Sequence, residues 1–204
     1  QEIQIPKTIG FLHCLLCHMK SILDYIKFYP EIATKSFCDE IVEYYRKNAD
    51  WKPSTFSTST GTSSETDRRV RMNDFWITES HRYHKELKDV FFSGINLYTK
   101  EFARVIPEGC TPFRINSYPE GGFMIPHVDN IHHSHGQRWG YPHITALMFM
   151  NDNYDGGEFV MCDGQWTAPK KQGSVVIFPS NFMYPHGVEK VTKGNRYTIM
   201  TWII

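Results

Sequence analysis

The second half of the chain consists of short apolar segments separated by turn-forming residues. Glycine stands beside aspartate, asparagine or another glycine at 121–122, 155–157, 163–164 and 193–195. Such pairs favour tight turns, because glycine adopts positive φ without a steric cost. The segments have the length and composition of strands, and they lie at 113–118, 124–128, 144–150, 158–161, 174–178, 186–191 and 197–204. Short strands at this spacing predict an antiparallel sandwich or barrel.

The first half has a different pattern, in which apolar residues recur at the three- and four-residue spacing of a helix. The expected helices span 12–26, 36–45 and 80–102, with Ser36 or Asp39 as the cap of the second. A polar loop at 53–67 is rich in serine, threonine and glycine, which fits a linker or an ordered lid. We therefore predict one domain over 1–204, with a mainly helical support region at 1–106 and a β core at 107–204.

Composition limits the classes of partner. With 41% apolar and 15% aromatic residues, 204 residues suffice for one domain with a full core. Lysine and arginine (22) balance aspartate and glutamate (22), so no net charge favours a nucleic-acid partner. No apolar run reaches the roughly 20 residues that span a bilayer, and we recognise no signal peptide. We expect neither a nucleic-acid nor a membrane partner.

The cysteines bear on location. Their number, five, is odd and fits free thiols in a reducing compartment. We therefore favour the cytoplasm, although a chain that starts at Gln1 and not at methionine gives little evidence on location.

Three residues of the β half have the types and spacing of metal ligands. His127 and Asp129 stand two apart in an expected strand, so their side chains point to the same side of the sheet. His186 begins a later strand and supplies a second imidazole. Two histidines and one carboxylate occupy one face of an octahedron and leave the other positions open, which suits non-haem Fe(II). A hydrogen-bonded histidine–aspartate pair without metal is the alternative interpretation.

Arg196 follows His186 across a Gly-Asn turn, at the start of the last expected strand. Alternate side chains share one face of this strand: Arg196, Thr198, Met200 and Trp202. An arginine that points inward from an apolar strand is costly without a counter-anion. A dicarboxylate held by the metal at one end could meet the guanidinium bidentately at the other. If the opposite face is the buried one, Arg196 is instead a surface residue.

Six segments follow one another in an order that carries a resemblance: Asn116-Ser-Tyr118, Pro126-His127-Val-Asp129, Thr145-Ala-Leu-Met-Phe-Met-Asn151, Gly156-Gly-Glu158, Gly173-Ser-Val-Val-Ile-Phe-Pro179 and His186 to Trp202. Together they resemble the Fe(II)/2-oxoglutarate-dependent dioxygenases, specifically the prolyl 4-hydroxylase-like branch. The resemblance covers about 113–204, nearly half of the chain. It implies a mainly β fold with flanking helices, a double-stranded β-helix (jelly-roll, cupin-like) barrel braced by the helices of the first half.

The resemblance also implies roles for particular residues. The three metal-ligating residues would be the catalytic iron ligands, and Arg196 would bind the distal carboxylate of 2-oxoglutarate. Three further residues would line the co-substrate pocket: Tyr118 through its hydroxyl, Thr145 beside the arginine, and Trp202. Ordinary core packing is the alternative for these three. The implied cofactor and co-substrates are Fe(II), 2-oxoglutarate and O2, with ascorbate as a candidate reductant.

The implied activity is hydroxylation of an unactivated C–H bond with release of succinate and CO2. The implied substrate is a peptidyl proline or another amino-acid-type molecule, so the expected partner is a peptide, a protein or a small amino-acid-like metabolite. A catalytically silent or 2-oxoglutarate-independent cupin-like metal-binding module is the alternative. Nucleic-acid demethylases of this kind carry a second arginine soon after the first, and the chain has none after Arg196.

The sequence departs from the family at the mouth of the expected pocket. An insertion follows Asp129, and Met124 stands where the family often has tyrosine. We expect the loops at 53–67 and 130–142 to form a lid. Three residues of the second loop are the expected substrate contacts: Arg138, Trp139 and Tyr141. Three histidines of the same loop are expected to meet solvent or an anionic substrate: His132, His133 and His135.

Overall fold

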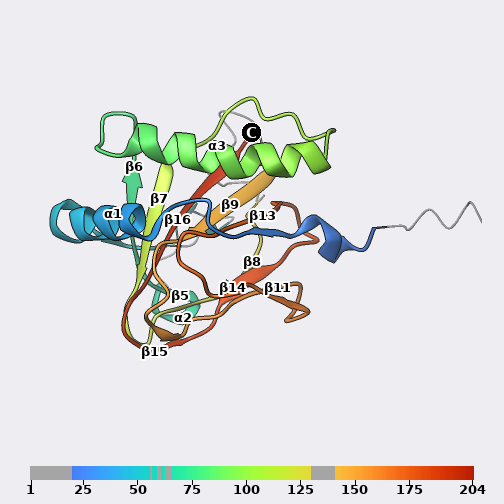
Figure 1. Cartoon of the computed structure of the whole chain (residues 1–204). Coiled ribbons are helices and arrows are strands. Elements are labelled where there is room, and N and C mark those ends of the chain that lie inside the picture. The colour runs from blue at the N-terminus through green and yellow to red at the C-terminus, as the bar shows by residue number, and fades with distance from the viewer. Residues whose placement is uncertain (1–19, 56, 59–60, 63–65, 130–140) are drawn as a thin grey trace, which may run out of the picture.

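The computed structural model describes residues 20–55, 57–58, 61–62, 66–129 and 141–204. Two antiparallel sheets pack against each other, and the helices lie on the outer side of the larger one (Figure 1). Adjacent strands of the larger sheet are, in order, β1 (Lys27–Tyr29), β13 (Val175–Pro179), β9 (Ile144–Phe149), β16 (Arg196–Ile203), β7 (Phe113–Tyr118), β6 (Asn73–Ile77) and β2 (Lys52–Pro53). Adjacent strands of the smaller sheet are β12 (Trp166–Thr167), β11 (Phe159–Met161), β14 (His186–Val188), β8 (Phe123–His127) and β5 (Val70–Arg71).

Shorter elements complete the described part of the chain. Two ribbons pair β10 (Asp155–Gly156) with β15 (Val191–Lys193), and β3 (Ser57–Thr58) with β4 (Gly61–Thr62). The helices are the 3-10 turn η1 (Ile22–Tyr25), α1 (Lys35–Asn48), α2 (Thr66–Arg69) and α3 (His84–Glu101). Among the described residues, no helix combines the length and the apolar character needed to cross a bilayer.

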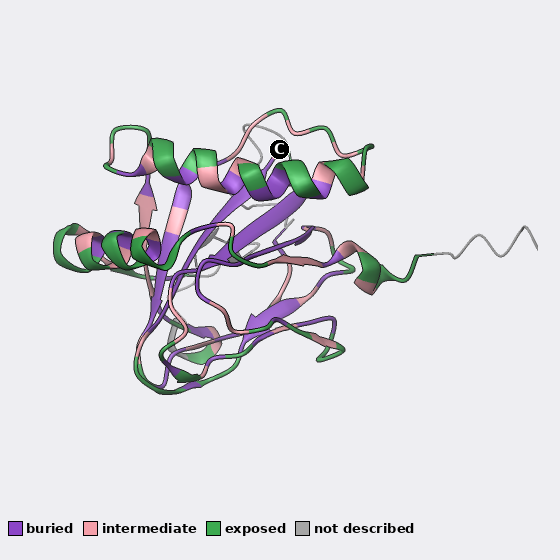
Figure 2. Cartoon of the chain, viewed as in Figure 1, coloured by how far each residue is buried: buried purple, intermediate pink, exposed green. Residues whose placement is uncertain are grey.

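The central strand β16 separates two hydrophobic layers. All eight of its residues are buried, because helices cover one face of the sheet and the smaller sheet covers the other. Alternate side chains therefore enter different layers. Ile199 lies in the layer under the helices, whereas Met200 lies between the sheets with Phe159 of β11. Figure 2 shows the buried strands in purple and the exposed outer sides of α1 and α3 in green.

The two long helices follow from local sequence. The apolar residues of α3 recur every three or four positions on its buried side: Leu87, Phe91, Ile95 and Tyr98. This confirms the predicted helix at 80–102 within a few residues. The second helix begins earlier than predicted, because Thr34 accepts a hydrogen bond from the Phe37 amide at 3.2 Å and caps α1.

The first half contributes strands as well as helices. Of the helix expected at 12–26, residues 12–19 lie outside the described residues, and only the turn η1 forms before β1. Strands β1, β2 and β6 extend the larger sheet, and β5 extends the smaller one. The prediction of a mainly helical support region missed these strands. They are two to five residues long, too short for a recognisable alternation.

The fold is mainly β with flanking helices, as predicted, but the predicted closed barrel is not found among the described residues. The two sheets share no strand pair there, so they face each other without closing into a barrel. The polar loop predicted at 53–67 contains the β3–β4 ribbon and the start of α2, while positions 56, 59–60 and 63–65 lie outside the described residues.

Candidate active site

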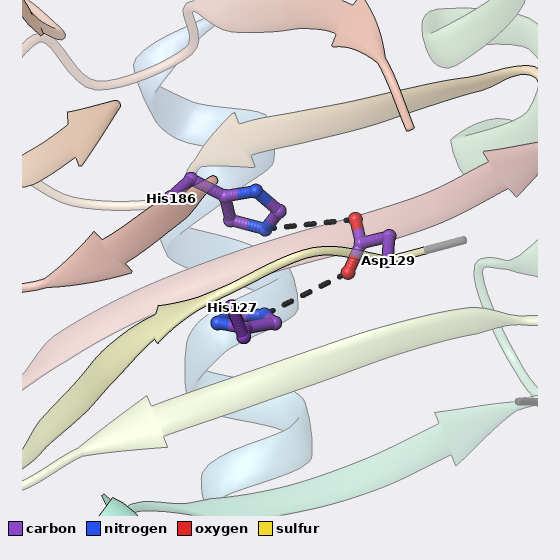
Figure 3. Close-up of side chains that lie close together, drawn as sticks. All are labelled: His127, Asp129 and His186. Carbon is purple, nitrogen blue, oxygen red and sulfur yellow. Dashed lines mark ion pairs between the residues drawn. The ribbon is translucent and has the colours of Figure 1, made fainter. Parts of the chain in front are cut away.

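Three side chains converge between the sheets at the ends of two neighbouring strands (Figure 3). His127 ends β8, Asp129 follows it, and His186 begins β14 directly opposite His127. The Asp129 carboxylate oxygens lie 3.7 Å from His127 Nε2 and 3.6 Å from His186 Nε2. One ligand atom of each residue lies within 4.8 Å of the other two, and no second cluster of this kind occurs in the described part of the chain. This geometry suits a shared metal ion.

Backbone carbonyls orient both imidazoles. His127 Nδ1 lies 3.1 Å from the Ile125 carbonyl oxygen, and His186 Nδ1 lies 3.0 Å from that of Tyr184. A carbonyl oxygen only accepts hydrogen bonds, so each Nδ1 carries a hydrogen. In the neutral imidazole this leaves the Nε2 lone pair, on the side of Asp129, available for a metal.

Burial and neighbouring charges set the protonation of the three groups. Burial, reinforced by His186, lowers the pKa of His127 to about 4. Burial also disfavours charge on His186, but Asp129 outweighs this effect and raises the pKa of His186 above its ordinary 6.5. Burial alone would raise the pKa of Asp129, whereas the two imidazoles hold it well below its usual range. His186 is therefore the residue of the triad that must lose a proton when a metal ion binds.

This protonation predicts a pH dependence of metal binding. Below the raised pKa of His186, Mn(II) affinity is expected to rise about tenfold per pH unit, because the metal displaces one proton. In the metal-free protein the His186–Asp129 pair contributes stability below pH 6.5, and this stability is lost as pH rises through the folded pKa. Calorimetric titration at about pH 6 in buffers of different ionisation enthalpy counts the protons released. Release of none would contradict a protonated His186.

Thr145 lies beside Asp129 and not, as expected, beside Arg196. Its hydroxyl donates to Asp129 Oδ2 at 2.6 Å and lies 2.9 Å from Ser180 Oγ. Because the Thr145 proton points to the carboxylate, Ser180 donates to Thr145. The strand register explains the correction: Thr145 pairs with Trp202 near one end of β16, and Arg196 begins the other end.

Removal of this hydroxyl by Thr145→Val is expected to lower Mn(II) affinity about 10- to 100-fold, the usual effect of losing an outer-shell hydrogen bond. Thr145→Ser should restore most of the affinity, since it keeps the donor. The matched control is Thr201→Val, which removes another buried hydroxyl, bonded to the Thr111 carbonyl at 2.9 Å. Calorimetric titration of all three variants is the measurement. Equal metal affinity in Thr145→Val and Thr201→Val would exclude a role for Thr145 in orienting Asp129.

Arg196 is the largest of the fully buried side chains among the described residues, and none of its surface is exposed. Its Nε, Nη1 and Nη2 atoms have no hydrogen-bond partner among these residues. The guanidinium carbon lies 4.9 Å from the centroid of the Tyr118 ring and 5.5 Å from that of Phe149. The predicted inward orientation is thus confirmed. A buried cation without an anion is costly, so the geometry is suited to receive a carboxylate bidentately.

Two neighbours shape the surroundings of this arginine. Gly157 has φ +65°, and a Cβ there would lie 3.1 Å from Arg196 Cδ and 2.9 Å from Val191 Cγ2. Only glycine fits this close approach without strain. Burial raises the pKa of Tyr154, and the nearby Arg196 charge acts against that rise. The Tyr154 hydroxyl is close enough to Arg196 for a hydrogen-bonding effect on its pKa, although the two groups make no hydrogen bond of normal geometry. Tyr154 is therefore a further polar group at the arginine end of the site.

Two other predicted site residues, Tyr118 and Trp202, lie in the layer between the sheets, and a third, Tyr141, is largely exposed. Tyr118 pairs with Arg196 across β7 and β16. Trp202 lies at the metal end, with its ring centroid 6.0 Å from that of Trp76. Tyr141 is 46% exposed, and no described contact ties it to the site. Several predicted residues lie outside the described part of the chain: Arg138, Trp139, His132, His133 and His135.

A cavity between the sheets connects the triad to Tyr118 and has mainly apolar walls. Two polar residues of its lining, Arg114 and Asn116, were not predicted. Both lie on β7, where they share a face with Tyr118. The alternation used to select the face of Arg196 would have found them, had it been applied to this strand.

Known proteins resemble this chain both in sequence and in fold. Residues 113–204 match the family model of the 2OG-Fe(II) oxygenase superfamily. The PKHD-type hydroxylase YbiX of Escherichia coli is 31% identical over 140 residues, which cover 66% of this chain and 61% of that protein. The chain thus spans about three fifths of the length of the curated relatives that it matches. Residues 113–204, a little less than half of the chain, are thus similar in sequence to the 2OG-Fe(II) oxygenase superfamily.

Solved structures narrow the fold to the prolyl 4-hydroxylase-like type of double-stranded β-helix. A prolyl-4-hydroxylase of Pseudomonas putida superposes with a TM-score of 0.66 at 16% identity, covering 88% of this chain and 91% of that chain. The viral collagen prolyl hydroxylase of Paramecium bursaria Chlorella virus-1, in its 2OG complex, gives 0.68 at 13%, with 92% and 98% covered. A Trichoplax adhaerens prolyl hydroxylase in complex with a hypoxia inducible factor peptide fragment gives 0.68 at 19%, with 88% and 83% covered.

Proposed function

We propose that this protein is an Fe(II)- and 2-oxoglutarate-dependent dioxygenase that hydroxylates an unactivated C–H bond and releases succinate and CO2. The observation that carries the proposal is Arg196, a fully buried guanidinium without a hydrogen-bond partner among the described residues. It faces the same layer between the sheets as the histidine–aspartate triad. A co-substrate with two separated carboxylates suits both ends of this layer.

The residues present fit the implied metal and co-substrate. His127, Asp129 and His186 supply the two imidazoles and one carboxylate of a facial Fe(II) site with open positions. Arg196, with Tyr118 beside it, would hold the distal carboxylate of 2-oxoglutarate. When bound, Fe(II), 2-oxoglutarate and O2 supply the oxidising chemistry, with ascorbate as a candidate reductant. The protein orients these groups and excludes water with the apolar walls of the cavity.

The proposed substrate is a peptidyl proline or another amino-acid-type molecule. Support comes from the prolyl hydroxylases among the structural neighbours, one of them in complex with a peptide fragment. A PKHD-type hydroxylase among the sequence relatives is consistent with the same reaction type.

The test is anaerobic addition of Fe(II) and then 2-oxoglutarate, followed in the visible spectrum. We expect the weak charge-transfer band of the iron-bound co-substrate in the wild type and its loss in Arg196→Ala. Succinate release on admission of O2 then provides a screen of proline-containing peptides and free amino acids. Iron binding without a band would instead indicate a 2-oxoglutarate-independent or silent metal-binding module, and would contradict the proposal.

A further inference from the structure

Arg114 is a second arginine in the layer that holds the triad. It lies on β7, where it pairs with Trp76 of β6 on one side and Met200 of β16 on the other. Its side chain lines the same cavity as the three candidate ligands. Its neighbour Met200 is two residues from Trp202, which pairs with Thr145 beside Asp129, so Arg114 lies at the metal end of the layer.

The described neighbours of Arg114 do not satisfy all the N–H donors of its guanidinium. The side chain is 13% exposed, and Nε is buried without a hydrogen-bond partner among the described residues. Asp74 is the one described carboxylate within 4.0 Å, and its Oδ2 lies 3.9 Å from Nη1, beyond hydrogen-bond distance. The guanidinium carbon lies 5.5 Å from the Trp76 ring centroid and 5.7 Å from that of Trp202. The two indole rings stabilise the positive charge of the guanidinium by cation–π contact. This contact does not use the N–H groups, which can still donate to an anion.

The guanidinium groups of Arg114 and Arg196 lie against different aromatic side chains. On β7, Arg114 is four residues from Tyr118, the residue that pairs with Arg196. At about 3.3 Å per residue, the backbone positions of the two arginines are therefore about 13 Å apart along the sheet. The Arg114 guanidinium lies near the rings of Trp76 and Trp202, and the Arg196 guanidinium near those of Tyr118 and Phe149. If Arg196 holds the co-substrate, as proposed above, Arg114 lies in the cavity of the triad without a function in co-substrate binding.

We infer that Arg114 binds a carboxylate of the substrate and so selects anionic substrates at this site. The inference rests on the proposed function, because it assigns the substrate of the same site. The carboxylate could be the α-carboxylate of a C-terminal or free amino acid, or an acidic side chain next to the hydroxylated residue. Both sources present the same planar anion to the guanidinium.

The test measures binding to protein loaded with Mn(II) and 2-oxoglutarate, so that Arg196 is already occupied. Two pairs of probes are titrated by calorimetry: N-acetyl-Ala-Pro against its amide, and N-acetyl-Ala-Pro-Glu amide against N-acetyl-Ala-Pro-Gln amide. In the wild type we expect the anionic member of one pair to bind at least about tenfold more tightly, since a bidentate charged contact supplies this difference. The pair that shows the preference identifies the source of the carboxylate.

Variants of Arg114 and Asp74 separate recognition from structural support. Arg114→Gln should lose the preference and keep 2-oxoglutarate loading, and Arg114→Lys should keep part of the preference. Asp74→Asn breaks the same long ion pair but should leave the preference intact, which a purely structural Arg114 would not explain. The double change Arg114→Gln with Asp74→Asn leaves no unpaired carboxylate, so it tests recognition even if Arg114→Gln alone folds poorly.

The outcomes distinguish this inference from the proposed function. Failure of the wild type to load 2-oxoglutarate contradicts the proposed function and the inference together. Loading without any preference for the anionic probes contradicts the inference alone. A preference that survives in Arg114→Gln also overturns it, because another group must then bind the carboxylate.

Discussion

Asp129→Ala is expected to abolish metal binding and, with it, all 2-oxoglutarate turnover. Asp129 is the anionic member of the triad, and its two oxygens approach both imidazoles. Loss of an outer-shell group alone costs about 10- to 100-fold in metal affinity, so loss of this ligand should exceed about 100-fold. Calorimetric titration with Mn(II), followed by a succinate assay with Fe(II), measures both effects.

An aspartate far from the site provides the control for this prediction. The side chain of Asp50 is 78% exposed and pairs only with Lys52 in the described part of the chain. Asp50→Ala should therefore leave metal affinity and turnover at the wild-type level. Unchanged turnover in Asp129→Ala would remove the triad from the mechanism, whatever the control shows.

Arg196→Met is expected to have two opposite effects. The affinity for 2-oxoglutarate should fall by roughly 100-fold or more, as for the loss of one partner of a buried, hydrogen-bonded charge pair. The stability of the co-substrate-free protein should rise by about 1–3 kcal/mol, because methionine fills similar space without an unsatisfied buried cation. Urea unfolding of the metal-loaded protein, with and without 2-oxoglutarate, measures both quantities.

The same unfolding experiment compares the stability of each variant with and without bound 2-oxoglutarate. At 2-oxoglutarate concentrations about 100 times Kd, the wild type should gain about 2.7 kcal/mol, and Arg196→Met should gain almost nothing. Arg46→Met replaces an exposed arginine of α1 and should keep the full gain. Lower stability of the co-substrate-free Arg196→Met protein would contradict an uncompensated charge at this position.

The candidate ligands could be predicted because strand geometry is local. The i, i+2 spacing of His127 and Asp129 gives both side chains the same direction on any strand. The turn residues between the segments predicted most strands of the second half, and β7 (Phe113–Tyr118) has the bounds expected for it. The same alternation placed Arg196 on the inner face of β16, where the structure has it.

Neighbours across strands could not be predicted in the same way. Thr145 was expected beside Arg196, but the pairing of β9 with β16 brings it opposite Trp202 and next to Asp129. Alternation along β7 gives the face of Arg114, but its neighbours Trp76 and Trp202 come from β6 and from the far end of the chain. Register decides such contacts, and it depends on pairing between segments distant in sequence.

The sequence by itself determined which residues can act: a histidine–aspartate pair on one strand face, a second histidine, and an arginine on an apolar strand. These follow from side-chain chemistry and from the two-residue period of a strand, which need no partner. Only the tertiary structure decided how they combine. It left Arg196 buried without a hydrogen-bond partner among the described residues, put Thr145 and Ser180 behind Asp129, and placed Arg114 near the metal end. Each of these results from packing two sheets whose strands come from both halves of the chain.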